Sequence, residues 1–420
     1  MKKIILYVLG ILIVDLALFP VELTALPGMN LKMLLAAVGV ICFGYNSVKN
    51  RSMEISRTLF GLMIISGLMS LTAYASTTIN NTTDYVLAIY IISMLVWFFS
   101  AYAACLAIKR IHGRIDIPTI GMYLVAVCVM QCILALVIDT VPAFAQFVDR
   151  YFFSEYIKTA ELRMMHRIYG IGAALDIAGI RFAGSLIILS EIILEFQRDD
   201  KKKKYIIWLW ILFSFIFVIG NMVSRTTIIG GAIGLANYFF RSVGKNMTVR
   251  KEAFLLPVIL VMAVIVFAYF GRNNSMFYQH LRFGFEGFFN LVENGEWSTH
   301  STDILQTMYR WPSELKTWII GDGLMEVDGH FYMFTDVGYI RFIYYFGTIG
   351  LSFFIMLYVF ALMEGVKMSR EHAIMFGLLF CLNMIVWFKV ATDTFIIFAF
   401  LLNTCELSKN NDEEPEEDAV

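Results

Sequence analysis

The chain has 420 residues, of which 59% are hydrophobic and only 16% are charged. Soluble globular proteins carry about 25% charged residues, and the mean hydropathy of this chain is +0.70. This composition excludes an ordinary soluble domain and predicts a polytopic membrane protein. Basic and acidic residues nearly balance, at 33 and 34, and no stretch has the character of a basic face that binds nucleic acid.

Apolar segments long enough to cross a bilayer recur along the chain. A transmembrane helix needs roughly 20 mostly apolar residues, or somewhat fewer where flanking side chains reach the interface. We predict twelve spans, at 4–20, 31–46, 59–76, 85–107, 118–138, 178–196, 205–223, 226–240, 253–270, 337–362, 373–388 and 390–404. The first is expected to stay in the membrane, because Pro20-Val21-Glu22 makes a poor signal-cleavage site. The predicted fold is therefore all-α, with one polytopic domain over 1–404 and an acidic cytoplasmic tail over 405–420.

The placement of basic residues predicts the orientation. With a cytoplasmic N-terminus, 20 of the 33 basic residues fall on the inner side, in keeping with the positive-inside rule. Two long loops, about 139–177 and 271–335, then lie outside the cytoplasm. The 13 outer basic residues are nine arginines and four lysines, whereas the inner set has eight arginines and twelve lysines. Because a guanidinium grips phosphate bidentately, an anion is expected at the outer face.

Two of the outer segments are rich in arginine. Ser224-Arg225-Thr226 makes a tight turn before a span, so Arg225 is placed beside a helix N-terminus, where anions are favoured. Alternatively, Arg225 snorkels to the interface and only anchors its helix. Arg163 and Arg167 belong to a basic cluster in the first long loop. Asp176 and Arg181 follow among apolar neighbours, where two charges either form a structural pair or face a cavity.

The third segment, Gly321 to Gly350, carries Asp336 and Arg341 into the start of a span. Ionisable groups at membrane depth are expensive, which makes them candidates for function. Five residues of helix would separate the two by about 7.5 Å and about 140°, so they are expected on different faces. Alternatively, Asp336 is only a helix N-cap. His330 is a further candidate for proton transfer, although most histidines in loops are simply solvated.

Patterns for metal or nucleotide binding are absent from the sequence. The six cysteines include no CxxC pair, and there is no HExxH or DxD motif. No glycine-rich phosphate loop follows a strand. The sequence therefore predicts no protein-bound metal, no cofactor and no disulfide framework.

Taken together, the outer segments resemble the O-antigen polymerase and O-antigen ligase superfamily. Ser224-Arg225-Thr226 resembles its serine-arginine turn, and Arg167-Ile-Tyr-Gly170-Ile-Gly172 resembles its arginine and glycine stretch in the first long outer loop. Asp336-Val337, then nine residues and Gly347-Thr-Ile-Gly350, resembles the element that ends its large loop. The ligases have a histidine where this chain has Asp336. The resemblance therefore favours a polymerase over a ligase.

The resemblance implies a GT-C-like glycosyltransferase of the bacterial inner membrane, with both termini cytoplasmic. Such an enzyme joins oligosaccharide repeat units carried on undecaprenyl pyrophosphate into a surface polysaccharide, such as O-antigen of lipopolysaccharide, capsule or exopolysaccharide. It implies lipid-linked glycans and membrane lipid as partners, and allows a chain-length regulator and a repeat-unit flippase. Asp336 is the expected catalytic base, with His330 as its substitute. The expected substrate-binding residues are all arginines: Arg225, Arg167, Arg163, Arg341 and Arg181.

Two alternatives to the polymerase stay open. An O-antigen ligase would pass the glycan to a different acceptor by the same chemistry. A transporter of lipid-linked substrates belongs to another class. The sequence has no repeated halves, and its charges gather at one membrane face, which disfavours a transporter.

Overall fold

The computed structural model describes residues 2–26, 28–49, 55–153, 162, 164–243 and 275–412. The predicted span 253–270, Arg163 and the end of the acidic tail lie outside these residues. The chain divides into two compact units, neither of which is continuous in sequence. Unit 1 comprises Met1–Leu34 and Ala107–Trp297, and unit 2 comprises Leu35–Leu106 and Ser298–Val420. The single polytopic domain expected over 1–404 stays a prediction.

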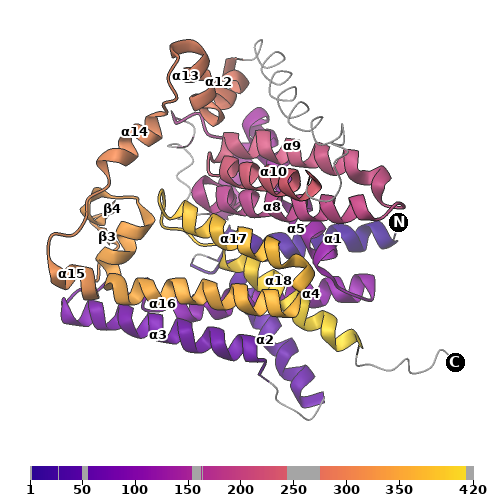
Figure 1. Ribbon diagram of the computed structural model, residues 1–420, viewed down its shortest axis with the longest axis horizontal. Coiled ribbons are helices and arrows are strands. Elements are labelled where there is room, and N and C mark those ends of the chain that lie inside the picture. The colour runs from indigo at the N-terminus through magenta and orange to yellow at the C-terminus, as the bar shows by residue number, and fades with distance from the viewer. Residues whose placement is uncertain are drawn as a thin grey trace. The chain divides into compact units, whose positions relative to one another are not determined.

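Unit 1 is built round one buried helix, α8. Its long helices are α1 (Lys2–Leu18), α5 (Ile117–Thr140), α8 (Leu175–Arg198), α9 (Ile206–Val223, preceded by the short η1, Lys203–Tyr205) and α10 (Thr227–Val243). Helix α8 packs against α5, α9 and α10 (Figure 1), and nearly all of its residues are buried. Its first turns carry small residues, Ala178, Gly179, Ala183 and Gly184, which let neighbouring backbones approach closely.

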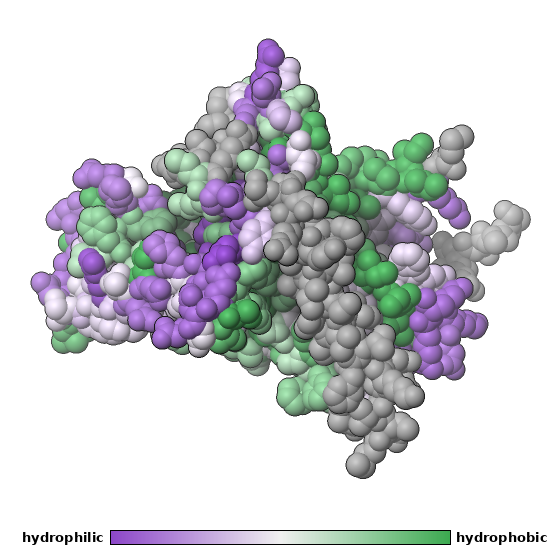
Figure 2. All heavy atoms as spheres, turned by 90° about the horizontal axis from the view of Figure 1, so that it is seen from above, coloured by the Kyte–Doolittle hydropathy of each residue, from purple (hydrophilic) through white to green (hydrophobic). Residues whose placement is uncertain are grey.

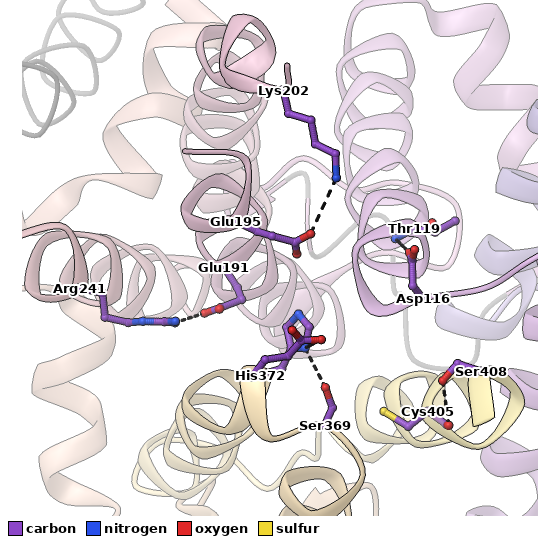
Figure 3. A network of polar contacts seen from close by, with 11 residues as sticks. Asp116, Thr119, Glu191, Glu195, Lys202, Arg241, Ser369, His372, Cys405 and Ser408 are labelled. Atoms are coloured by element: carbon purple, nitrogen blue, oxygen red, sulfur yellow. Dashed lines mark hydrogen bonds and ion pairs between the residues drawn. The ribbon is translucent and has the colours of Figure 1, made fainter. Parts of the chain in front are cut away.

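A buried ion pair joins α8 to α10. The carboxylate of Glu191 accepts a hydrogen bond from the guanidinium of Arg241 (Figure 3), and only 5% of the Glu191 side chain is exposed. Close by, the amide of Asn237 donates to the Ser190 hydroxyl at 3.0 Å. Because a buried charge is costly without its partner, these contacts fix the register of the two helices.

The shorter elements of unit 1 fall in segments that were predicted as outer loops. Pro142 begins α6 (Pro142–Tyr151), a position where the missing N–H of proline costs nothing. The following β2 (Phe152–Phe153) pairs antiparallel with β1 (Glu22–Leu23), with Phe153 opposite Glu22. Two amphipathic helices, α12 (Ser275–Gly284) and α13 (Glu286–Asn294), come later in the chain, and α12 packs on α9.

Unit 2 is organised round the longest helix, α16. Most or all of each of these elements belongs to it: α2 (Leu31–Lys49), α3 (Arg57–Ile79), α4 (Tyr90–His112), α14 (His300–Thr307), α15 (Leu315–Ile320), β3 (Glu326–Val327), β4 (His330–Phe331), η2 (Tyr332–Phe334), α16 (Gly338–Met368), η3 (Arg370–His372), α17 (Ala373–Val386) and α18 (Phe395–Asp412). Helix α16 packs against α3, α15, α17 and α18 (Figure 1). The Ser369 hydroxyl and His372 Nδ1 are hydrogen-bonded at 2.8 Å in the turn before α17 (Figure 3).

Helix α16 is broken at Gly347. Phe346 and Gly347 leave the helical conformation, and Gly347 has φ +67° and ψ −174°. This backbone region is essentially restricted to glycine. A Cβ at Gly347 would also lie only 2.1 Å from the carbonyl oxygen of Ile319, at the end of α15. The glycine therefore permits both the break and the close passage of α15.

Eleven of the twelve predicted spans overlap a described helix, and the twelfth, 253–270, lies outside the described residues. Within the described part of the chain, seven segments are long and apolar enough to cross a membrane: α2, α3, α4, α5, α8, Lys203–Val223 and α16. Large apolar side chains are exposed on such helices, including Ile41 (70%), Leu71 (65%) and Trp208 (64%), and Figure 2 shows hydrophobic patches among the hydrophilic residues on one face. These features are those of an all-α, multi-pass membrane protein.

The segment 271–335, expected as one polar loop, contains regular structure in its described part. It holds four short helices and the hairpin β3–β4. The units divide within it, so that α12 and α13 belong to unit 1, whereas α14, α15 and the hairpin belong to unit 2.

Candidate functional site

Arg225 lies in the turn between α9 and α10, as predicted. Ser224 is the C-cap of α9, and its carbonyl accepts from the amide of Thr227, which starts α10. The Thr226 hydroxyl donates to the Asp176 carboxylate at 2.8 Å, which ties the turn to the first turn of α8. The turn is thus held from both sides, and the Arg225 backbone has a defined position at the helix start.

The segment that carries Arg167 is hydrogen-bonded to the helices of unit 1. Ile171, which follows Arg167 in this segment, donates its amide to the side-chain oxygen of Gln131 at 3.0 Å. The Ile171 carbonyl accepts from the Gln131 amide group, also at 3.0 Å. Gln131 lies on α5, is fully buried, and donates a second hydrogen bond, of 2.8 Å, to Asp15 of α1. This network pins the segment that carries Arg167 against α5.

The two arginines meet at one aromatic ring. The guanidinium carbon of Arg225 lies 4.3 Å from the ring centroid of Phe283, and that of Arg167 lies 4.8 Å from the same centroid. Arg225 Nε also donates to the Phe283 carbonyl at 2.9 Å, and its Nη2 lies 2.5 Å from the carboxylate of Glu286. Segments 58 and 116 residues from Phe283 in the chain are thereby joined at the end of α12. We call Arg167 and Arg225 the arginine pair.

The arginine pair concentrates positive charge in a partly buried place. Burial lowers the pKa of Arg225 below its ordinary value, and the charge of Arg167 lowers it further, while Glu286 opposes the change. Both groups nevertheless stay cationic, because an arginine does not lose its proton in a protein. Two cations beside one another gain from a polyvalent anion, which bidentate guanidinium groups bind well.

Two other charged residues predicted in these segments, Arg181 and Asp176, make contacts of their own. Arg181 lies over the ring of Phe19, 5.4 Å from its centroid, and donates to the carbonyl of Ile177 at 3.3 Å. Its side chain is buried within unit 1. Asp176 accepts a hydrogen bond from Thr226, as described above. The contacts described for Arg181 and for Asp176 are therefore with different partners.

His280 joins the two segments of unit 1 that were predicted as long outer loops. Its Nδ1 lies 2.6 Å from the carbonyl oxygen of His166, and its Nε2 lies 3.0 Å from the Asp139 carboxylate. Burial alone would lower the pKa of His280, but the hydrogen bonds to Asp139 and to the His166 carbonyl outweigh it and raise the pKa above 6.5. A cavity of about 280 Å³ lies beside it and is lined by both Asp139 and Arg167.

Asp336 and Arg341 form an ion pair in unit 2, with 3.6 Å between Oδ1 and Nη1. The expectation that they lie on different helix faces is wrong, because α16 begins only at Gly338 and Asp336 precedes it. The N-cap of α16 is Val337, and no side chain caps it, so Asp336 is not the cap either. Arg341 also lies 3.8 Å from the Glu326 carboxylate and 3.8 Å from the ring centroid of Phe331.

His330 lies in the β3–β4 hairpin, on an exposed stretch. The hairpin turn is Asp328-Gly329, in which both residues have positive φ, the conformation of the tight turns that connect two strands. The His330 ring lies 6.0 Å from that of Phe334. Phe331 and Glu326 of the hairpin both contact Arg341, so the hairpin that carries His330 packs against the residue that pairs with Asp336.

Comparison of the chain with protein-family models, with curated proteins and with solved structures gives no match. The resemblance to the polymerase and ligase superfamily therefore stays a prediction. Among the described residues, no group of three or more His, Cys, Asp or Glu side chains is arranged to hold a metal ion.

Two contributors to the arginine pair were not predicted. Phe283 and Glu286 lie in the part of the sequence interpreted only as polar loop. The segment Arg282-Phe-Gly-Phe-Glu286 carries aromatic and acidic residues beside a glycine, which indicates a packed turn and not an open loop. No local pattern relates them to Arg167 or Arg225, because those contacts arise only when α12 packs on α9.

Proposed function

We propose that this protein is a polysaccharide polymerase. It joins oligosaccharide repeat units carried on undecaprenyl pyrophosphate into a surface polysaccharide, at the outer face of the bacterial inner membrane. The observation that supports the proposal is the arginine pair. Two arginines predicted separately to bind the pyrophosphate contact the same phenylalanine ring and are fixed there by surrounding polar contacts.

In the proposed reaction, a sugar hydroxyl of the acceptor attacks the anomeric carbon of the donor glycan. The bond between that carbon and the pyrophosphate oxygen breaks, and the lipid pyrophosphate leaves. The arginine pair stabilises the charge that develops on this leaving group. Asp336 accepts the proton of the attacking hydroxyl, and His330 takes this role if Asp336 only orients the acceptor. Arg341, which contacts two carboxylates, holds Asp336 in position.

The proposal includes the finer architecture expected from the sequence. The chain crosses the membrane twelve times in a GT-C-like arrangement, with both long loops outside and both termini in the cytoplasm. Its partners are lipid-linked glycans and membrane lipid, and the resemblance also allows a chain-length regulator and a repeat-unit flippase.

The proposal is tested by polymer formation from purified lipid-linked repeat units, in membranes that hold equal amounts of each variant. Arg225→Ala is expected to abolish polymer. Arg225→Lys is also expected to be poor, because an ammonium cannot make the bidentate contact or replace the bond from Nε to the Phe283 carbonyl.

Arg282→Ala is the matched control. Arg282 belongs to the same helix as Phe283 but pairs with Glu293 on the exposed surface, so its loss should leave polymer yield near that of wild type. Full activity of Arg225→Ala would overturn the proposed role of the pair. Transfer of single repeat units to another acceptor, without chain growth, would identify a ligase instead.

A further inference from the structure

A second polar cavity lies wholly within unit 2. Its volume is about 260 Å³, which is just below the usual range for drug-sized ligands and suits a single ring. It opens beside Gly321-Asp322-Gly323, a motif to which the proposed reaction gives no role. We call it the Asp322 pocket. The residues that line it are Pro312, Ser313, Glu314, Thr317, Asp322, Tyr332, Met333 and Tyr344.

The backbone round Asp322 is held firmly against helices of unit 2. The amides of Asp322 and Gly323 donate to the carbonyls of Tyr344 and Tyr345, at 2.6 and 3.0 Å. Gly321 and Gly323 both have positive φ, and a Cβ on Gly321 would lie 2.5 Å from the Tyr345 backbone. The two glycines therefore let the chain pass close to α16 while Asp322 faces the cavity.

The polar groups of the pocket are already oriented. The Thr317 hydroxyl donates to Asp322 Oδ1 at 2.7 Å, and the Tyr332 hydroxyl lies 3.3 Å from Asp322 Oδ2. Burial and the nearby carboxylates raise the pKa of Tyr332 to about 12, so its hydroxyl keeps its proton and donates to Asp322. The rings of Tyr332 and Tyr344 meet edge to face, with centroids 5.4 Å apart.

We propose that the Asp322 pocket binds one neutral or amino sugar of the lipid-linked oligosaccharide, an inference that rests on the proposed function. Carboxylates accept hydrogen bonds from sugar hydroxyls, and Asp322 and Glu314 provide two of them. Tyrosine rings offer apolar surface to the C–H groups of a sugar ring. The described residues that line the pocket include carboxylates but no lysine or arginine, which disfavours the pyrophosphate and acidic sugars.

The test measures the affinity of the full-length protein, in lipid nanodiscs, for two probes. One is the lipid-linked oligosaccharide extracted from cells that lack this protein, and the other is undecaprenyl pyrophosphate without sugar. Asp322→Asn and Glu314→Gln should each weaken binding of the first probe about tenfold, the size expected for one hydrogen bond to a charged group. Neither variant should change binding of the second probe. Glu314 is exposed, so its replacement leaves the fold intact even if Asp322→Asn does not.

Asp328→Asn is the matched control, because it removes a carboxylate from the same outer segment at the exposed hairpin turn, where asparagine is equally suited to positive φ. It should bind both probes as wild type does. Arg225→Ala should weaken binding of both probes, and if it weakens binding of neither, the proposed function fails. If Arg225→Ala weakens binding of both probes but the two pocket variants bind the first probe as wild type does, only the proposed sugar site is wrong. Equal weakening of both probes by the pocket variants would also overturn it.

Discussion

His280 contacts two segments of unit 1 that are distant in sequence, through both of its ring nitrogens. One nitrogen faces the carbonyl oxygen of His166, which can only accept, and the other faces the Asp139 carboxylate. The doubly protonated ring satisfies both contacts, whereas the neutral ring satisfies only one. No pattern in the sequence indicates these contacts, because neither partner is near His280 in the chain.

The stability of the protein should therefore depend on the protonation of His280. Its pKa is raised in the folded state, so its contribution is complete below pH about 6.5 and is lost as pH rises through the raised value. Thermal unfolding of the purified protein between pH 5.5 and 8.5 should show this loss, and His280→Gln should flatten the profile. His300→Gln, at an exposed position, should keep the wild-type profile. An unchanged profile in His280→Gln would contradict the assignment.

Asp336 offers a second test at the residue scale. If it accepts the proton of the acceptor hydroxyl, Asp336→Asn should reduce polymer yield by roughly 10²-fold or more, because asparagine keeps the size but not the basicity. The variant also removes one partner of the buried Arg341, so thermal stability must be measured alongside activity. A stable variant with near-wild-type yield would move the assignment to His330.

The arginine pair could be predicted from residue patterns only in part. The turn that carries Arg225 could be predicted from Ser224-Arg225-Thr226, since polar residues between two apolar runs must reverse the chain. The contact of Arg225 with Phe283 could not, because it depends on the packing of α12 against α9. Similarly, the face on which Asp336 lies was predicted wrongly because Asp336 was treated as part of the helix, which begins only at Gly338.

At the scale of elements, the break in α16 depends on one residue. Within the apolar run 338–368, Gly347 looks like any other small residue of a membrane helix. Its positive φ follows from the passage of α15, a helix of six residues that hydropathy alone does not reveal. Long apolar helices were thus predictable from composition, whereas short helices and breaks depend on contacts between segments.

Gly347→Ala should destabilise the protein by about 2 kcal/mol or more, from backbone strain together with the clash against Ile319. The measurement is the thermal midpoint of the purified protein. Gly377→Ala is the control, because Gly377 lies in α17 of the same unit with open space round it, and alanine is the better helix former. Equal midpoints for the Gly347 variant and wild type would show that the backbone there is not strained.

At the scale of the whole molecule, the two units interrupt one another in sequence. The chain leaves unit 1 after Leu34, returns at Ala107 and leaves again after Trp297. The first two of these three transitions fall inside helices, because α2 and α4 each cross a boundary. Sequence composition could not reveal such a division, since it is defined by contacts between distant helices.

The orientation in the membrane is open to direct measurement. Reporter fusions at Glu293, in the second long outer segment, and at Asn411, near the end of α18, should report opposite compartments. The prediction follows from the lysines and arginines on the inner side. Reporting of the same compartment by both fusions would mean a different number of spans between them.

The hydrogen bonds from Asp322 and Gly323 to the carbonyls of α16 also have a consequence for how this outer segment can be studied. The Asp322 pocket depends for its shape on α16, a helix that is long and apolar enough to cross a membrane. A water-soluble fragment of residues 298–335 would carry Asp322 and Tyr332 but would lack both carbonyl acceptors and the wall made by Tyr344. The proposed sugar recognition is therefore expected of the inserted protein and not of this fragment, and it should arise only once α16 has entered the membrane.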